Sequence, residues 1–209
     1  MHLTVFGASG SIGSLVVDQA LAAGHTVTAH TRDTARVVAR PAYADRLHVV
    51  AGDVTDPADC RRALQDADAV AVTLGAGRHG AVREAGTRAV VAAMSDAGVS
   101  RLVVQSTLGI GDSRVHLDWW WRRVMFGLLL RAAYADHERQ EEVVRASDLD
   151  WTILRPSAFT DDPVPGVRAG FGPDQDGLRL KVARRDVAAA VLAAAADRSH
   201  LREAVSLSA

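Results

Sequence analysis

Three glycines spaced three residues apart stand between an apolar run and an alanine-rich stretch near the start of the chain. Residues 3–6, Leu-Thr-Val-Phe, are typical of a buried strand, and Gly7, Gly10 and Gly13 follow, with a helix predicted over residues 11–23. Glycines let the backbone turn sharply and approach a ligand, while the start of the helix offers unpaired N–H groups and the positive end of its dipole. This order of strand, glycine turn and helix predicts a site for the pyrophosphate of a dinucleotide.

The rest of the chain alternates between short runs rich in valine, leucine and threonine and alanine-rich stretches of helical length. This alternation predicts an α/β fold of the Rossmann type, with a doubly wound parallel sheet in a three-layer α/β/α arrangement. Strands are expected at residues 2–6, 26–31, 47–51, 69–74, 101–106, 151–155 and 203–207, and helices at 11–23, 57–65, 81–97, 133–147 and 184–197.

Length and composition bound the class of protein. With 209 residues, 48% of them hydrophobic, the chain can bury one sizeable core, and we expect a single domain over residues 1–209. A net charge of −1 provides no field that would hold nucleic acid or an anionic membrane. The start of the chain lacks a signal-peptide pattern, no apolar run is long enough to span a bilayer, and a single cysteine, Cys60, fits a reducing compartment. We therefore expect a cytoplasmic protein.

The end of the second predicted strand indicates which dinucleotide is bound. Thr31 closes the strand, Arg32 follows, and Asp33 stands one place further into the turn. An acidic residue at the strand end would bind the ribose hydroxyls of NAD, whereas a guanidinium suits the 2′-phosphate of NADP. We therefore expect NADP(H); the alternatives are a solvated surface charge for Arg32 and a helix cap for Asp33.

Further segments after the later strands carry a resemblance to a known family. They are Ala51-Gly52-Asp53-Val54, Thr73-Leu74-Gly75, Gln105-Ser106-Thr107, and Asp-Leu-Asp-Trp-Thr-Ile-Leu-Arg-Pro at 148–156. With the glycine turn, they make nearly the whole chain resemble the atypical short-chain dehydrogenase/reductase family, in the NAD(P)-binding group that includes flavin reductase/biliverdin reductase B and NmrA-like proteins.

The resemblance implies a role for residues at the carboxyl end of each strand. Asp53 would bond to the adenine amino group, and Val54 would pack on the ring; residues 74–76 would line the nicotinamide ribose and pyrophosphate, and residues 156–159 would cover the nicotinamide. Alternatively, Asp53 caps its own turn and Ser106 satisfies backbone groups at a strand end. The full expected cofactor set is Gly7, Ala8, Ser9, Gly10, Ser11, Ile12, Gly13, Thr31, Arg32, Asp53, Val54, Leu74, Gly75, Ala76, Ser106, Pro156, Ser157, Ala158 and Phe159.

The chain departs from many relatives in its proton-transfer residues. Those relatives use a tyrosine with a lysine four residues later, because the lysine lowers the pKa of the tyrosine. Here neither tyrosine has a lysine at that spacing, the only lysine is Lys181, and alignment places His137 at the lysine position. Hydride transfer needs no protein nucleophile, so the missing pair does not exclude a reductase. It favours acceptors that solvent can protonate, such as flavins, quinones, tetrapyrroles or enones.

Four residues form the expected catalytic constellation. Hydroxyls of Ser106, Thr107 and Tyr134 would polarise the acceptor, and His137, with an unperturbed pKa of about 6.5, would supply a proton. The alternative for His137 is a helix histidine that packs or caps. The flavin/biliverdin reductase branch carries a histidine just after its proline pair, and Ser157 follows Pro156 here, which argues against tetrapyrrole specificity.

The substrate side is expected near residues 108–132 and 157–183. Three of the four tryptophans lie at 119–121, and they can wall a pocket for a flat, conjugated ligand, pack in a subunit interface, or lie on a membrane surface. We favour the pocket, with Phe159 and Phe171 completing it and residues 160–181 as a lid. Histidines stand singly, so no metal site is expected.

Two functions fit these features. The first is an NADPH-dependent reductase of a flat, conjugated or quinoid small molecule. The second is a non-catalytic NADP(H)-responsive regulator, as the NmrA-like relatives imply. Both require dinucleotide binding, both leave a homo-oligomer open, and turnover separates them.

Overall fold

A computed structural model describes residues 1–38, 40–75, 82–116, 130–170 and 179–209 of the chain. Strands and helices alternate along it as the sequence predicts. The elements are β1 (His2–Phe6), α1 (Gly13–Ala22), β2 (Thr26–Thr31), η1 (Thr34–Arg36), η2 (Pro41–Tyr43), β3 (Leu47–Ala51), α2 (Pro57–Ala63), β4 (Ala69–Val72), α3 (Arg83–Ala97), β5 (Arg101–Gln105), η3 (Gly111–His116), α4 (Arg131–Arg145), β6 (Asp150–Pro156), β7 (Ala158–Thr160), β8 (Arg168–Ala169), β9 (Lys181–Ala183), α5 (Arg184–Ala196) and β10 (Glu203–Ser208).

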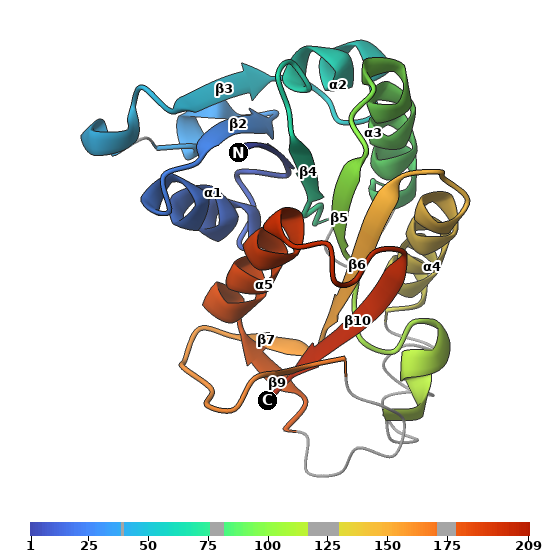
Figure 1. Cartoon of the computed structure of the whole chain (residues 1–209). Coiled ribbons are helices and arrows are strands. Elements are labelled where there is room, and N and C mark those ends of the chain that lie inside the picture. The colour runs from blue at the N-terminus through green and yellow to red at the C-terminus, as the bar shows by residue number, and fades with distance from the viewer. Residues whose placement is uncertain (39, 76–81, 117–129, 171–178) are drawn as a thin grey trace.

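One eight-stranded sheet forms the centre of the molecule. Its order is β3-β2-β1-β4-β5-β6-β10-β8, and every neighbouring pair is parallel except the edge pair β10 and β8. The chain moves outward from β1 to β2 and β3, then returns to place β4 on the other side of β1 (Figure 1). This reversal is the doubly wound Rossmann topology, and the predicted fold class is confirmed.

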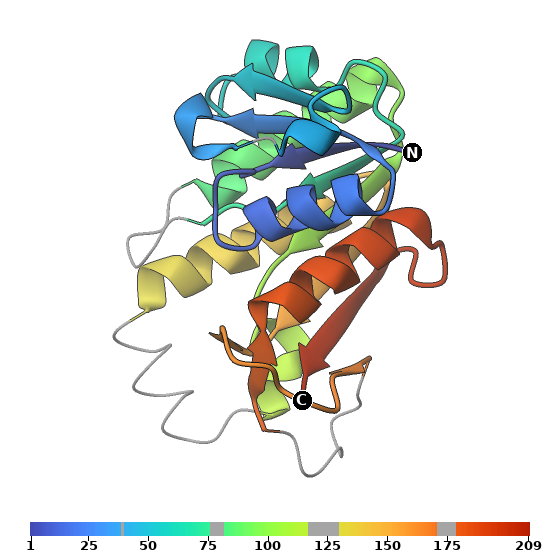
Figure 2. The ribbon, with the colours of Figure 1, turned by 90° about the vertical axis from the view of Figure 1, so that its left-hand side faces the viewer.

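Helices cover both faces of this sheet. Helices α1 and α5 lie together on one face, and α2, α3 and α4 lie on the other (Figures 1 and 2). Successive side chains of a strand point to opposite faces, so Ala69 and Ala71 of β4 join the core beneath α1 and α5, while Val70 and Val72 join the core beneath α2 and α3. Both faces are therefore buried, which explains why the central strands are apolar at nearly every position.

The expected elements are all present, and their ends differ from the predicted ones by no more than two residues. The sequence did not predict three short strands. Strands β7 and β9 pair in a separate two-stranded sheet, and β8 pairs with β10. Strand β8 falls inside residues 160–181, the stretch expected to form a lid. Its pairing with β10 is a contact between distant segments, and local composition carries no signal of it.

Two glycines set how closely α1 approaches the sheet. Gly7 has a φ of +86°, and a Cβ on it would lie 2.8 Å from the carbonyl oxygen of Thr73. A Cβ on Gly13 would lie only 2.1 Å from the carbonyl oxygen of Gly7. The start of α1 is thereby held against the carboxyl ends of β1 and β4. No helix in the described ranges is both long and apolar enough to cross a membrane.

Candidate functional site

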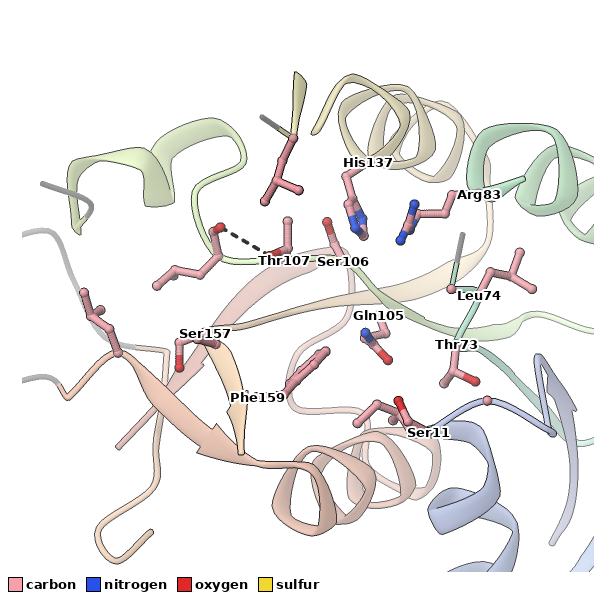
Figure 3. Close-up of a pocket in the computed structure, with 17 residues that line it drawn as sticks. Ser11, Thr73, Leu74, Arg83, Gln105, Ser106, Thr107, His137, Ser157 and Phe159 are labelled. Atoms are coloured by element: carbon pink, nitrogen blue, oxygen red, sulfur yellow. Dashed lines mark hydrogen bonds between the residues drawn. The ribbon is translucent and has the colours of Figure 1, made fainter. Parts of the chain in front are cut away.

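Two adjoining cavities open at the carboxyl ends of the strands, where the strand order reverses. The central cavity, of about 340 Å³, lies over the ends of β1, β4, β5 and β6 (Figure 3). The β2-side cavity, of about 170 Å³, lies over the ends of β1, β2 and β3. Gly10, Thr73, Leu74 and Gly75 line both, so the two cavities form one cleft that crosses the glycine turn. Ligands of open α/β sheets bind in such a crevice.

The glycine turn supplies backbone donors to the middle of this cleft. Gly10 lines both cavities, and Ser11 and Ile12 line the central one. No side chain caps the start of α1, and its first turn holds no acidic residue. The N–H of Gly10 donates to the carbonyl of Gly7 at 2.9 Å. The positive end of the helix dipole therefore faces the cleft without a competing acidic residue in the first turn, which fits a pyrophosphate.

Two members of the predicted cofactor set in this turn lie outside both cavities. Ala8 is buried, and its N–H donates to the carbonyl of His30 at 3.3 Å. Gly13 makes the close contact with Gly7 described above. Both shape the turn and do not line the cleft, whereas Gly7 and Ser9 line the β2-side cavity.

Asp53 and Val54 lie together in the β2-side cavity, as the resemblance implies. The backbone N–H and the hydroxyl of Thr55 donate to Oδ1 of Asp53 at 2.9 and 2.8 Å, and these bonds lower the pKa of the Asp53 carboxyl. Asp53 is therefore an anionic acceptor at neutral pH that also caps its own turn. The cap and a bond to a ligand amino group are compatible, because a carboxylate has two oxygens.

Two arginines that follow β2 belong to the lining of the same cavity. Arg32 and Arg36 both line it, and Thr31 is fixed there by a 2.8 Å bond from its hydroxyl to Ser9. The carboxylate of Asp33 accepts from the N–H of Ala35 at 3.2 Å and caps η1. His30, unpredicted from sequence, also lines the cavity; it is buried, with an unpartnered Nε2 and a pKa lowered by burial.

The far end of the central cavity brings together most of the residues predicted there. Ser106, Thr107 and His137 line it with Ser157, Ala158 and Phe159 (Figure 3). Pro156 does not: it closes β6, and its carbonyl accepts from Leu108 at 2.8 Å. Tyr134 does not line it either, because its hydroxyl donates to the carbonyl of Gly109 at 2.7 Å and holds the loop after β5. Ala76 lies outside the described residues.

Ser106 is bonded to a buried ion pair that the sequence analysis missed. Its hydroxyl lies 2.7 Å from Oε1 of Glu141. The Arg155 guanidinium donates to both oxygens of Glu141, from Nε at 2.9 Å and from Nη2 at 2.7 Å, and also pairs with Asp112. Both Glu141 and Arg155 are almost fully buried. Arg155 stood in the quoted motif and Glu141 in the predicted helix, but only the fold shows that they meet.

His137 is held in its neutral form by its surroundings. Burial, with the neighbouring positive charge of Arg83 as a further cause, lowers the pKa of His137 to about 3. Its Nδ1 is buried without a hydrogen-bond partner. At neutral pH His137 therefore lines the cavity as an uncharged imidazole. We expected an imidazolium that could donate its proton as a catalytic acid, and that charged form is not present at neutral pH.

Arg83 is a wall residue for which the sequence offered no signal. It begins α3, and its guanidinium points toward the central cavity between Leu74 and His137 (Figure 3). Nη1 pairs with Asp136 at 3.3 Å, while Nε is buried and unpartnered. Gln105 also lines the central cavity, and its Oε1 is buried and unpartnered. Orphaned buried polar atoms around one cavity are what a site for a polar ligand is expected to show.

Some predictions concern residues that the structure does not describe. The tryptophans at 119–121 and Phe171 are among them, so the alternatives of pocket wall, interface and membrane contact stay predictions. In the ranges that are described, no three histidine, cysteine, aspartate or glutamate side chains gather as metal ligands would.

Comparisons with known proteins agree with this geometry. Residues 7–198 match the model of an NAD(P)H-binding family. A UPF0659 protein of Schizosaccharomyces pombe is 29% identical over 219 residues, covering 97% of this chain and 87% of that protein. A solved structure of ChuY, an anaerobilin reductase from Escherichia coli, is 28% identical with a TM-score of 0.77, and the match covers 99% of this chain and 96% of that one.

A short-chain dehydrogenase/reductase of Veillonella parvula, solved in complex with NADP, shares the fold. Its TM-score is 0.81 at 21% identity, and the match covers 99% of this chain and 93% of that one. The cleft and the family match together define a nicotinamide dinucleotide-binding protein with a Rossmann fold. The chain belongs to the NAD(P)H-binding family.

Proposed function

We propose that this protein is an NADPH-dependent reductase of a flat, conjugated or quinoid small molecule. The observation that carries the proposal is the central cavity, which adjoins the β2-side cavity and the glycine turn at the carboxyl ends of the strands. Pockets for small conjugated ligands are mostly apolar, with a few polar groups that fix orientation. Leucines and Phe159 supply the apolar wall here, and the polar groups gather near Ser106.

The choice of NADPH rests on the walls of the β2-side cavity. Arg32 and Arg36 both line it, and two guanidiniums can donate to the oxygens of a 2′-phosphate. Asp33, the acidic residue nearest to the strand end, bonds to the N–H of Ala35. A carboxylate in that role is not directed at ribose hydroxyls, so the arrangement favours NADP(H) over NAD(H).

When bound, the nicotinamide supplies the hydride, and the protein fixes the distance and the face of the acceptor. Thr107 lines the cavity, and its hydroxyl makes only a long 3.4 Å bond to the carbonyl of Leu108. A carbonyl oxygen of the acceptor can compete for that proton. Neutral His137 can orient the acceptor by hydrogen bonding. Proton delivery from solvent completes the reduction for acceptors such as quinones, flavins and enones.

The likeness to ChuY supports reduction of a conjugated molecule as the kind of reaction. The regulatory alternative shares the cleft and differs in turnover. The test is NADPH oxidation, followed at 340 nm, with a panel of quinones, flavins, enones and a linear tetrapyrrole. We expect turnover with at least one class, faster with NADPH than with NADH. Tight NADPH binding without oxidation in the whole panel would favour a regulator and contradict the reductase.

A further inference from the structure

The wall of the central cavity contains one fixed charge among the residues described as lining it, and that charge is Arg83. Its side chain is only 9% exposed. A buried guanidinium is retained where its charge and its five donors are matched by acceptors. The bonds that Arg83 makes within the protein therefore show which of its donors, and how much of its charge, are left for a ligand.

Asp136 of α4 holds Arg83 in place but has other partners. Its Oδ2 accepts from the N–H of Arg83 at 3.2 Å and from Nη1 at 3.3 Å, and its Oδ1 accepts from the N–H of Glu84 at 3.2 Å. Asp136 thus caps the first turn of α3, where backbone donors and the helix dipole offset its negative charge. The positive charge of Arg83 is only partly neutralised by this carboxylate.

The Nε atom of Arg83 is buried without a partner. A buried donor without an acceptor is costly, so the guanidinium has hydrogen-bonding capacity that Asp136 does not use. Figure 3 shows the guanidinium on the wall opposite Ser11, so a ligand that passes from the glycine turn toward Ser106 runs beneath it.

We propose that Arg83 is an anion-binding residue of the central cavity, whose guanidinium takes a phosphate or carboxylate oxygen of the bound ligand. Two sources can supply such an oxygen. One is the pyrophosphate of the dinucleotide; the other is an anionic group on the acceptor, and this second case rests on the reductase proposed above.

The test uses two variants and one control. Arg83→Met removes the charge at similar length, and Arg83→Met with Asp136→Asn also avoids an unpaired buried carboxylate. Arg88→Met is the control, because it removes the same charge from the same helix at an exposed ion pair outside the cavity. Circular dichroism establishes that each variant is folded.

Two equilibrium titrations by calorimetry separate the sources. The first measures the Kd of NADPH. The second compares FMN with riboflavin on protein saturated with NADP⁺; these two flavins differ in a phosphate, and the measurement needs no turnover. A lost charge-assisted hydrogen bond predicts a change of about tenfold or more in the affected Kd.

A tenfold rise in the Kd of NADPH for both Arg83 variants, and not for Arg88→Met, assigns the oxygen to the dinucleotide. Loss of a wild-type preference for FMN over riboflavin, with NADPH unaffected, assigns it to the acceptor. Unchanged affinities in folded variants overturn the proposal. If neither flavin binds the wild-type protein, the NADPH titration alone decides whether Arg83 binds an anion: a rise in the Kd supports the proposal, and an unchanged Kd overturns it. Failure of the reductase proposal is visible separately, as absence of NADPH oxidation with every acceptor.

Discussion

The hydroxyl of Ser106 donates its proton to the carboxylate of Glu141, away from the central cavity that Ser106 lines. Arg155 donates to both oxygens of Glu141, and the carboxylate of such an ion pair accepts the proton of the Ser106 hydroxyl. Ser106 therefore presents lone pairs to a ligand. The neighbouring Thr107 is the hydroxyl that remains able to donate.

This difference predicts unequal effects of removing the two hydroxyls. Thr107→Val should lower kcat for NADPH-dependent reduction by about tenfold or more, in keeping with the loss of a hydrogen bond to charge that develops on the acceptor. Ser106→Ala should change kcat by less than about threefold, because it removes an acceptor. Thr107→Ser is the control that restores the hydroxyl. The measurement is steady-state kinetics of each variant with the best acceptor of the panel. A larger loss of kcat for Ser106→Ala than for Thr107→Val would contradict the assigned direction of the bond from Ser106 to Glu141.

The pair of Glu141 and Arg155 predicts a large effect on stability. Glu141→Ala leaves a buried guanidinium without its main partner, and removing one member of a buried pair costs about 3–5 kcal/mol. The double variant Glu141→Met with Arg155→Met should lose much less than the sum of the single losses. Glu84→Ala, at an exposed pair with Arg88, should leave the free energy of unfolding nearly unchanged. Urea unfolding measures all of these, and equal small losses would show that the pair contributes little.

His137 predicts how stability depends on pH. Its pKa is about 3 in the folded protein, below the 6.5 of an exposed histidine, so the unfolded chain binds more protons between those values. The free energy of unfolding should therefore fall as the pH decreases from 6.5 toward 3, by up to about 1.4 kcal/mol per pH unit from this group. Urea unfolding at pH 7, 6 and 5 should show a shallower fall for His137→Gln than for the wild type. Parallel curves for the two proteins would refute the buried neutral histidine.

The glycine turn predicts a contrast between two alanine substitutions. Gly13→Ala places a Cβ 2.1 Å from the carbonyl oxygen of Gly7, and that backbone cannot move without displacing α1. Gly75→Ala meets no atom within 4 Å. Overpacking costs about 1–3 kcal/mol, and each kcal/mol shifts the melting temperature of a chain of this size by about 2–4 °C. We therefore expect Gly13→Ala to lower the melting temperature by about 2–12 °C, and Gly75→Ala to melt close to the wild type. Equal melting temperatures would mean that α1 does not approach β1 so closely.

The fold and the cofactor half of the site follow from local sequence. Alternating apolar runs and helical stretches predict the order of elements. Gly10, Arg32 and Asp53 each come within four residues of the end of a strand whose carboxyl end must border the cleft. The parts that sequence did not predict depend on contacts between distant segments. Arg83 meets Asp136 across 53 positions, and Ser106 meets Glu141 across 35.

The same reasoning applies to Tyr134 and His137. Sequence places both on one helix, with His137 at the lysine position of the family and Tyr134 one place away from the tyrosine position, but the direction of each side chain is set by packing. Tyr134 turns to the carbonyl of Gly109, and His137 enters a buried wall beside Arg83. Residue type alone indicates a reactive hydroxyl and a titrating imidazole, whereas burial and partners decide what these groups can do.

The most direct test of this account is calorimetric titration of the purified, folded protein with NADPH and with NADH, repeated on Arg32→Glu. We predict binding of NADPH at one site per chain, weaker binding of NADH, and a loss of about tenfold or more for NADPH in Arg32→Glu with little change for NADH. Absence of measurable affinity for either dinucleotide in the folded wild-type protein would contradict the central claim that the glycine turn holds a dinucleotide.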